Sequence, residues 1–130
     1  SSEMRPRRLL PAFRDRRGDI TDILDGVALN SVTIISSKKG VVRGNHVHRR
    51  TIQYTYLLSG RVRYVCRTGE RGRVRSYLMR PGELAASPPG EAHAVVALAD
   101  SSFMVLSRGP RHGRSYEDDT FRLAVPIAAP

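Results

Sequence analysis

Three of the four histidines in this chain stand at spacings that suit a metal site. His46 and His48 are separated by one residue in a stretch of strand-like composition, so both side chains would project from the same face. His93 follows a stiff Pro-Pro-Gly turn, and Gln53 lies a short way beyond the paired histidines. Imidazole is a frequent ligand of transition metals, and an amide oxygen can complete the set. We therefore predict a divalent metal bound by His46, His48, Gln53 and His93.

The elements that would position these ligands are short strands. The chain shows no sustained 3.6-residue periodicity, and glycine, proline or charged turns recur at intervals typical of a β-sandwich or barrel. This pattern predicts an all-β fold. The predicted strands cover residues 27–36, 41–49, 52–59, 61–67, 72–79, 83–87, 93–98, 102–108 and 120–124.

Local turn signals suggest how two of these strands pair. Ser59-Gly60 lies between two β-rich runs, and a glycine there can adopt the positive φ of a tight hairpin turn. We expect the strands 52–59 and 61–67 to pair directly, and a hairpin to bring Gln53 beside the histidine pair. Residues 1–12 are predicted to be a flexible arm or an edge strand given to a partner, and the C-terminal tail is predicted to be loose.

Composition limits the class of protein. A chain of 130 residues with 40% hydrophobic residues fits one domain, residues 1–130, with a core that needs no disulfide. The net charge is +10, yet the basic residues are mostly arginines spread from Arg5 to Arg122, with no basic helix, so we predict no nucleic-acid partner. Selection for an anionic ligand and a merely arginine-rich surface both remain open. Cys66 is the only cysteine and no long apolar run occurs, which predicts a cytoplasmic protein without a membrane partner.

The spacing of the predicted ligands resembles the two motifs of the cupin family over most of residues 27–108. Gly40, His46, His48, Gln53 and Gly60 match the first motif, and Gly82, Pro88, Gly90 and His93 match the second. The resemblance implies a small jelly-roll barrel, a double-stranded β-helix with the ligands in its lumen. Two positions depart from the family pattern: Gln53 replaces the usual glutamate ligand, and Ala97 replaces an asparagine.

The glutamine changes the electrostatics of the predicted site. Three neutral imidazoles and a neutral amide would leave a divalent ion with its full charge, so the site should prefer an anionic ligand or acidify a bound water. Zn, Fe, Ni and Mn all remain candidates. A metal-free lumen, in which the histidines are simply hydrogen-bonded, also remains open.

Three segments resemble the nucleotide-sugar cupins more closely. FRDRRGDI at residues 13–20 is similar to a segment of the dTDP-4-dehydrorhamnose 3,5-epimerases, and RGNH at 43–46 is similar to that family and to the sugar ketoisomerases. SYEDDTFRL at 115–123 resembles the close of the capsular-biosynthesis cupins. This resemblance implies that Arg17 and Arg43 contact the substrate and that His46 is the catalytic base.

His46 cannot serve both as a free base and as a metal ligand, because coordination occupies the lone pair that a base needs. If a metal is bound, the resemblance leaves proton transfer to one of the tyrosines Tyr54, Tyr56 and Tyr116, and the sequence does not select among them.

The leading hypothesis is an isomerase or epimerase of a nucleotide-linked or phosphorylated sugar, acting in polysaccharide or secondary-metabolite biosynthesis. A metal-dependent oxygenase or lyase acting on a small organic acid is the second, and a non-catalytic binding protein is the third. We also predict a homodimer, and if the N-terminal arm is swapped between the copies, Arg17 could reach the lumen of the neighbouring subunit.

Overall fold

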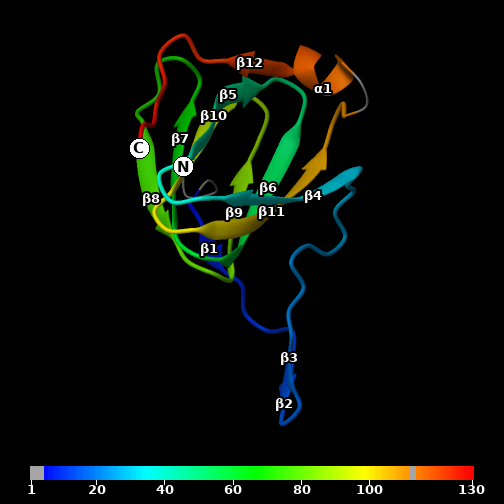
Figure 1. The fold of residues 1–130 in the computed structure, drawn as a ribbon. Coiled ribbons are helices and arrows are strands. Elements are labelled where there is room, and N and C mark those ends of the chain that lie inside the picture. Colours follow the sequence, from blue (N-terminus) through cyan, green and yellow to red (C-terminus); the bar gives the residue numbers. More distant parts are fainter. Residues whose placement is uncertain (1–4, 112–113) are drawn as a thin grey trace.

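Two five-stranded antiparallel sheets face each other and enclose the interior in the computed structural model, which describes residues 5–111 and 114–130 (Figure 1). The all-β prediction is confirmed. The first sheet has the order β1-β9-β6-β11-β4 and the second β12-β5-β10-β7-β8. The strands of the first sheet are β1 (Arg7–Arg8), β9 (Glu83–Ser87), β6 (Ile52–Ser59), β11 (Ser101–Arg108) and β4 (Ser31–Ser37). Those of the second are β12 (Thr120–Arg122), β5 (Val42–His48), β10 (Glu91–Ala97), β7 (Val62–Thr68) and β8 (Arg75–Met79).

Apolar side chains from both sheets meet between them. The core cluster consists of Leu57, Val62, Tyr64, Cys66, Met79, Ala85, Val95 and Phe103. Strand β6 shows the alternation that builds this interior, since Gln53, Thr55 and Leu57 are buried while the residues between them are more exposed. One face of each strand therefore points into the barrel and the other points outward.

The turn at Gly60 joins strands of different sheets, and the predicted hairpin is wrong. Strand β6 pairs with β9 and β11, whereas β7 pairs with β10 and β8. The glycine itself is required, because its φ is 91° and a Cβ there would overlap Asp100 and Ser101. The local signal identified the turn correctly, but the jelly-roll connection carries the chain across the barrel instead of back along it.

The N-terminal segment belongs to its own barrel. Strand β1 pairs with β9 of the same chain, Arg7 opposite Leu84 and Arg8 opposite Glu83, so this part is not a free arm. Residues 1–4 of the predicted arm lie outside the described residues.

Beyond β1, the strands β2 (Phe13–Asp15) and β3 (Gly18–Ile20) form a separate hairpin, which extends away from the barrel (Figure 1). This hairpin was not among the predicted strands.

The C-terminal tail is held by Asn45, although the sequence predicted a loose one. The backbone amides of Ile127 and Ala128 donate to Asn45 Oδ1 at 2.9 and 3.2 Å, and Asn45 Nδ2 donates to the Ala128 carbonyl at 3.1 Å. A short helix, α1 (Arg114–Asp118), precedes β12 at this end of the barrel. No helix in the described part of the chain is long and apolar enough to cross a membrane.

Candidate active site and metal centre

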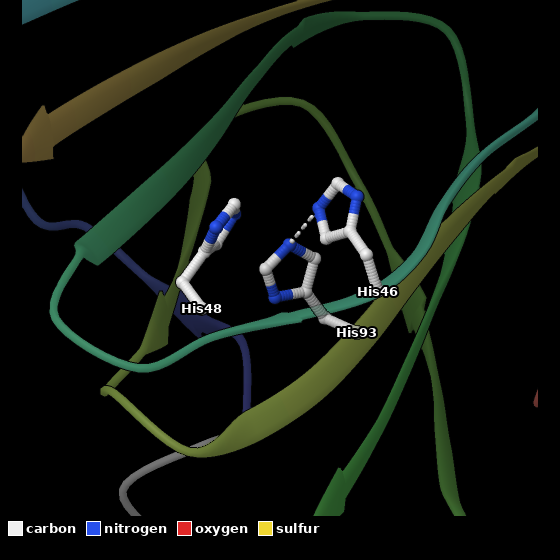
Figure 2. Close-up of side chains that lie close together, drawn as sticks. All are labelled: His46, His48 and His93. Carbon is white, nitrogen blue, oxygen red and sulfur yellow. Dashed lines mark hydrogen bonds between the residues drawn. The ribbon is translucent and has the colours of Figure 1, made fainter. Parts of the chain in front are cut away.

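Three histidines converge in the barrel interior, as Figure 2 shows. His46 and His48 come from β5 and His93 from β10, where His46 and His93 are paired directly across the two strands. The Nε2 atoms of His46 and His93 are 3.0 Å apart, and one candidate ligand nitrogen from each histidine lies within 4.8 Å of the others. Each ring is therefore placed so that one ion could reach all three.

A β-bulge in β5 sets the direction of His46. The register between β10 and β5 shifts between His93 and Ala94, so Asn45 is the extra residue, and both Gly44 and Asn45 have positive φ, 91° and 58°. A Cβ on Gly44 would lie 2.8 Å from the His93 carbonyl oxygen. Glycine at this position thus allows β5 to lie tightly against the strand that carries the third histidine.

His48 is oriented by a loop at the end of the helix. Its Nδ1 lies 3.0 Å from the backbone carbonyl of Asp119, which can only accept, so Nδ1 carries the proton. The other nitrogen, Nε2, is buried and has no hydrogen-bond partner of good geometry among the described residues. A lone pair left unpaired in the interior is costly unless something binds it, and this observation fits a metal at the cluster.

The Asp119 side chain fixes the turn between β5 and β6. Its carboxylate accepts hydrogen bonds from the backbone amides of Arg49, Arg50 and Thr51 and from the Thr51 hydroxyl at 2.6 Å. Burial alone would raise the pKa of Asp119, but these hydrogen bonds lower it overall. Asp119 therefore holds both His48 and the start of β6 in place.

All three rings are neutral near pH 7. Burial, followed by the charges of His48 and Arg122, lowers the pKa of His46 to about 4. Burial is also the first cause that lowers the pKa of His48, and it lowers that of His93 well below its usual value. Neutral imidazole is the form that binds metal, so the cluster has the protonation state that a metal centre requires.

Gln53 reaches the lumen from the facing sheet, not from a hairpin partner of β5. It is buried and lines the pocket together with His46 and His93. Burial lowers the pKa of His48, and the nearby Gln53 side chain offsets part of that lowering. The position fits the predicted fourth ligand, and coordination by its amide oxygen stays a prediction.

The pocket in front of the histidines has an apolar wall and a cationic rim. Ile35, Val95, Phe103 and Val105 line the wall, and Arg43 and Arg111 supply the positive charges. No aspartate or glutamate is among the described residues that line it. An anion entering this pocket would meet two guanidinium groups and no opposing carboxylate.

Both arginines are held in position. Arg43 donates through Nε to Ser37 Oγ at 2.7 Å and through a terminal nitrogen to the Ser36 carbonyl at 2.9 Å. The Arg111 guanidinium lies over the Tyr116 ring, 4.6 Å from its centroid. The resemblance implied a substrate contact for Arg43 but not for Arg111, which follows Gly109-Pro110 in an irregular segment without any directional pattern.

Of the three tyrosines named as proton-transfer candidates, one lies at the pocket and two lie outside it. Tyr116 on α1 lines the pocket, and its ring centroid is 5.4 Å from that of His48. Tyr54 and Tyr56 alternate with the inward Gln53 and Thr55, so they lie on the outer face of β6 and have no place at the histidines.

Arg17 lies on the extended hairpin, where it forms an ion pair with Asp15 at 2.7 Å. Figure 1 shows this hairpin pointing away from its own barrel, so Arg17 does not reach the lumen of its own chain.

The cupin domain family model matches residues 34–108, which is more than half of the chain. A search of curated protein sequences finds no significant match.

Solved structures share the fold at low sequence identity. One is the sugar 3,4-ketoisomerase QdtA from Thermoanaerobacterium thermosaccharolyticum in complex with TDP, with a TM-score of 0.73, 18% identity, and coverage of 90% of this chain and 85% of that one. Another is dTDP-4-dehydrorhamnose 3,5-epimerase from Sulfolobus tokodaii, with a TM-score of 0.67, 21% identity, and coverage of 81% and 68%.

The capsular polysaccharide assembling protein CapF from Staphylococcus aureus has a TM-score of 0.65 and 22% identity. The match covers 90% of this chain but only 34% of CapF, so the chain spans about a third of that protein. At these identities the likenesses show the fold.

Proposed function

The chain belongs to the cupin domain family, and on that premise we propose that it isomerises or epimerises a nucleotide-linked or phosphorylated sugar inside its barrel. The observation that carries the proposal is the pocket itself, which Arg43 and Arg111 line together with two neutral histidines, His46 and His93, and with no lining carboxylate among the described residues. The solved relatives of this fold include a 3,5-epimerase and a 3,4-ketoisomerase that act on sugars. The low identity to them makes the reaction class a proposal for this chain.

The pocket offers charged contacts for the phosphates of such a substrate and apolar contacts for its sugar. Arg43 and Arg111 would hold the phosphates, since a guanidinium donates two parallel hydrogen bonds to an anion. Val95, Phe103 and Val105 would pack against the less polar face of the sugar and exclude water.

Proton transfer has two candidates that lie in the pocket. His46 is neutral above its pKa of about 4 and can accept a proton from the carbon beside a keto group when its lone pair is free. If His46, His48, His93 and Gln53 hold a metal, the ion would polarise the keto oxygen, and the phenolate form of Tyr116, which lines the pocket, would accept the proton from carbon and return it. The proton would return on the other face of the same carbon or on the next carbon.

Hydrogen exchange tests the proposal directly. Incubating the protein in D₂O with a dTDP-linked 4-keto-6-deoxyhexose should incorporate deuterium beside the keto group, observed as loss of that proton's NMR signal. Tyr116→Phe in the metal-bound protein, or His46→Gln in the metal-free protein, should slow exchange by about 100-fold or more. Full exchange in both variants, or none in the folded wild-type protein, would contradict the proposal.

A metal-dependent oxygenase or lyase acting on a small organic acid is a second candidate, favoured by the three-histidine cluster and the unpaired Nε2 of His48. Oxygen consumption by protein that contains iron or nickel would favour this reading over the sugar isomerase.

We also propose that the protein is a homodimer, because two apolar surfaces of the chain lack a cover. The outer face of the first sheet carries apolar side chains that are at least partly exposed on four strands: Val32 and Ile34 on β4, Met104 on β11, Tyr54, Tyr56 and Leu58 on β6, and Ala86 on β9. Leu84 and Leu106 on the same face are already buried within the chain. Val32 and Ile34 are 59% and 66% exposed. On the extended hairpin, Phe13 and Ile20 are directly opposite each other and are 54% and 60% exposed.

A second copy of the chain could cover both the outer face of the first sheet and the apolar side chains of the hairpin. In a two-fold assembly the hairpin of each copy can lie on the other barrel while the sheet faces pack together. Arg17 would then approach the neighbouring pocket, which its own fold does not allow, and would serve there as a substrate-binding residue.

Sedimentation analysis should show a dimer for the wild-type protein and a shift towards monomer for Val32→Lys/Ile34→Lys, with association weakened roughly 100-fold because the interface would bury two charges from each copy. Val125→Lys is the matched control, because Val125 is 75% exposed but lies outside this face. A monomeric wild-type protein, or a double variant that stays dimeric, would rule out this interface.

A further inference from the structure

One edge strand carries contacts that hold both arginines of the pocket. Strand β4 lies at the edge of the first sheet, where β11 is its neighbour. Thr33 and Ile35 on this strand line the pocket, whereas Val32 and Ile34, which alternate with them, point outward and are exposed. One face of β4 therefore forms a wall of the pocket.

The end of β4 holds Arg43. The guanidinium donates through Nε to Ser37 Oγ at 2.7 Å and through Nη2 to the Ser36 carbonyl at 2.9 Å. Ser37 is only 6% exposed, and a short hydrogen bond from a charged donor to a buried hydroxyl restricts the direction of the side chain. A guanidinium has five N–H donors, so these two contacts leave donors for a ligand.

The start of β4 holds the segment that leads to Arg111. Asn30, the residue before the strand, donates through Nδ2 to the Gly109 carbonyl at 2.6 Å, and the Gly109 amide donates to Asn30 Oδ1 at 3.0 Å. The Asn30 amide also donates to the Ser107 carbonyl at 2.9 Å. Gly109 packs closely against Thr51, because a Cβ at this position would overlap the threonine side chain. These contacts fix the backbone two residues before Arg111.

The Arg111 side chain has weaker contacts of its own. Its Nη2 lies 3.4 Å from Thr33 Oγ1, and the guanidinium lies over the Tyr116 ring. A hydrogen bond of this length is weak, so it orients the side chain less than the two Asn30 bonds restrain the backbone. Arg111 is therefore positioned mainly through the chain that carries it.

We propose that Asn30 and Ser37, which flank β4 at its start and its end, are positioning residues that aim Arg111 and Arg43 at one anion in the pocket. A guanidinium is a planar fork, so its affinity for a phosphate depends on its orientation. Restraining both forks from one strand lowers the conformational entropy that is lost when the ligand binds. The inference rests on the proposed function only in taking these two arginines as the groups that bind the phosphates.

Double-mutant cycles test this role, with inorganic pyrophosphate as the probe in calorimetric titrations of the protein as purified. Ser37→Ala and Asn30→Ala should each weaken pyrophosphate binding roughly 3- to 10-fold. Because Ser37 acts through Arg43, Ser37→Ala should have little further effect in Arg43→Gln, and Asn30→Ala should have little further effect in Arg111→Gln. The crossed pairs, Ser37→Ala with Arg111→Gln and Asn30→Ala with Arg43→Gln, should show much less coupling.

Ser101→Ala is the matched control for the loss of a buried hydroxyl. Ser101 lies directly opposite Ser37 in the pairing of β4 with β11 and is 5% exposed. Its hydroxyl bonds the backbone of Arg61 and Ala99 and not a guanidinium. This variant should have a lower melting temperature and unchanged affinity for pyrophosphate, which a purely structural role of Ser37 would also predict for Ser37→Ala.

The inference would be overturned by unchanged affinity in Ser37→Ala or Asn30→Ala, by equal coupling in the matched and crossed pairs, or by a wild-type protein that does not bind pyrophosphate. These readouts do not depend on turnover. Matched coupling in a protein that shows no deuterium exchange would refute the isomerase and leave the positioning role intact. Exchange without matched coupling would refute the positioning role alone.

Discussion

Simultaneous replacement of His46 and His93 by alanine is expected to reduce bound metal from near-stoichiometric to background. The two rings lie on paired strands with their Nε2 atoms 3.0 Å apart, and without them only His48 and Gln53 would remain of the predicted ligands. Two ligands do not hold a divalent ion against water at the concentrations used in purification. Elemental analysis of protein purified without added metal or chelator measures the difference.

Thr55→Ala is a matched control for this experiment, because Thr55 lines the same pocket but is not a predicted ligand, and the metal content of this variant should equal that of the wild type.

The pH dependence of metal binding provides a second check. Since burial lowers the pKa of His46 to about 4, protons should begin to displace the metal only as the pH falls towards that value, well below the usual pKa of histidine. Wild-type protein without metal would refute the metal centre and leave His46 as the free base.

Replacement of Arg43 and Arg111 by glutamine is expected to abolish most of the affinity for a phosphorylated ligand. Hydrogen bonds to charged groups contribute enough that each substitution should weaken binding of a nucleoside diphosphate roughly 10- to 100-fold. The loss should appear as a smaller rise in melting temperature when dTDP is added. Of the two substitutions, Arg43→Gln should also lower the folding stability more, because the Arg43 guanidinium donates hydrogen bonds to Ser37 Oγ and to the Ser36 carbonyl.

Arg63→Gln is the control for charge alone, since Arg63 is exposed on β7 and bonds only Ser76 in the described structure. It removes one positive charge without touching the pocket, so dTDP should protect it as well as it protects the wild type. Equal loss in all three variants would mean that dTDP binds through general surface charge and not through the pocket.

The histidines could be predicted from the sequence because local rules determine their direction. His46 and His48 alternate in a strand, and the turn at residues 88–90 leads directly into β10, which carries His93. The same rule, applied one step further, would have excluded Tyr54 and Tyr56, because they alternate with Gln53 and cannot share its face.

The remaining features depend on contacts that only the folded chain makes. The pairing of β6 with β11 instead of β7 is a property of the whole barrel, whereas hairpin signals are local. Asp119 lies in the segment that resembles the capsular cupins, but its role as the acceptor for the turn at residues 49–51 could not be inferred from the motif. The burial of Glu91 at the start of β10 could not be predicted either, since a glutamate after a glycine in a turn is ordinarily exposed to solvent.

The bonds from Asn45 to residues 127 and 128 also determine when the site can be completed during synthesis. Strand β5 leaves the ribosome early, yet its neighbours β10 and β12, the Asp119 acceptor and the residues that bind Asn45 are all made much later. Contacts of such long sequence separation form slowly. A nascent chain that ends before β12 can therefore have much of the first sheet in place while His48 still lacks its orienting partner, so the histidine cluster is among the last parts of the protein to mature.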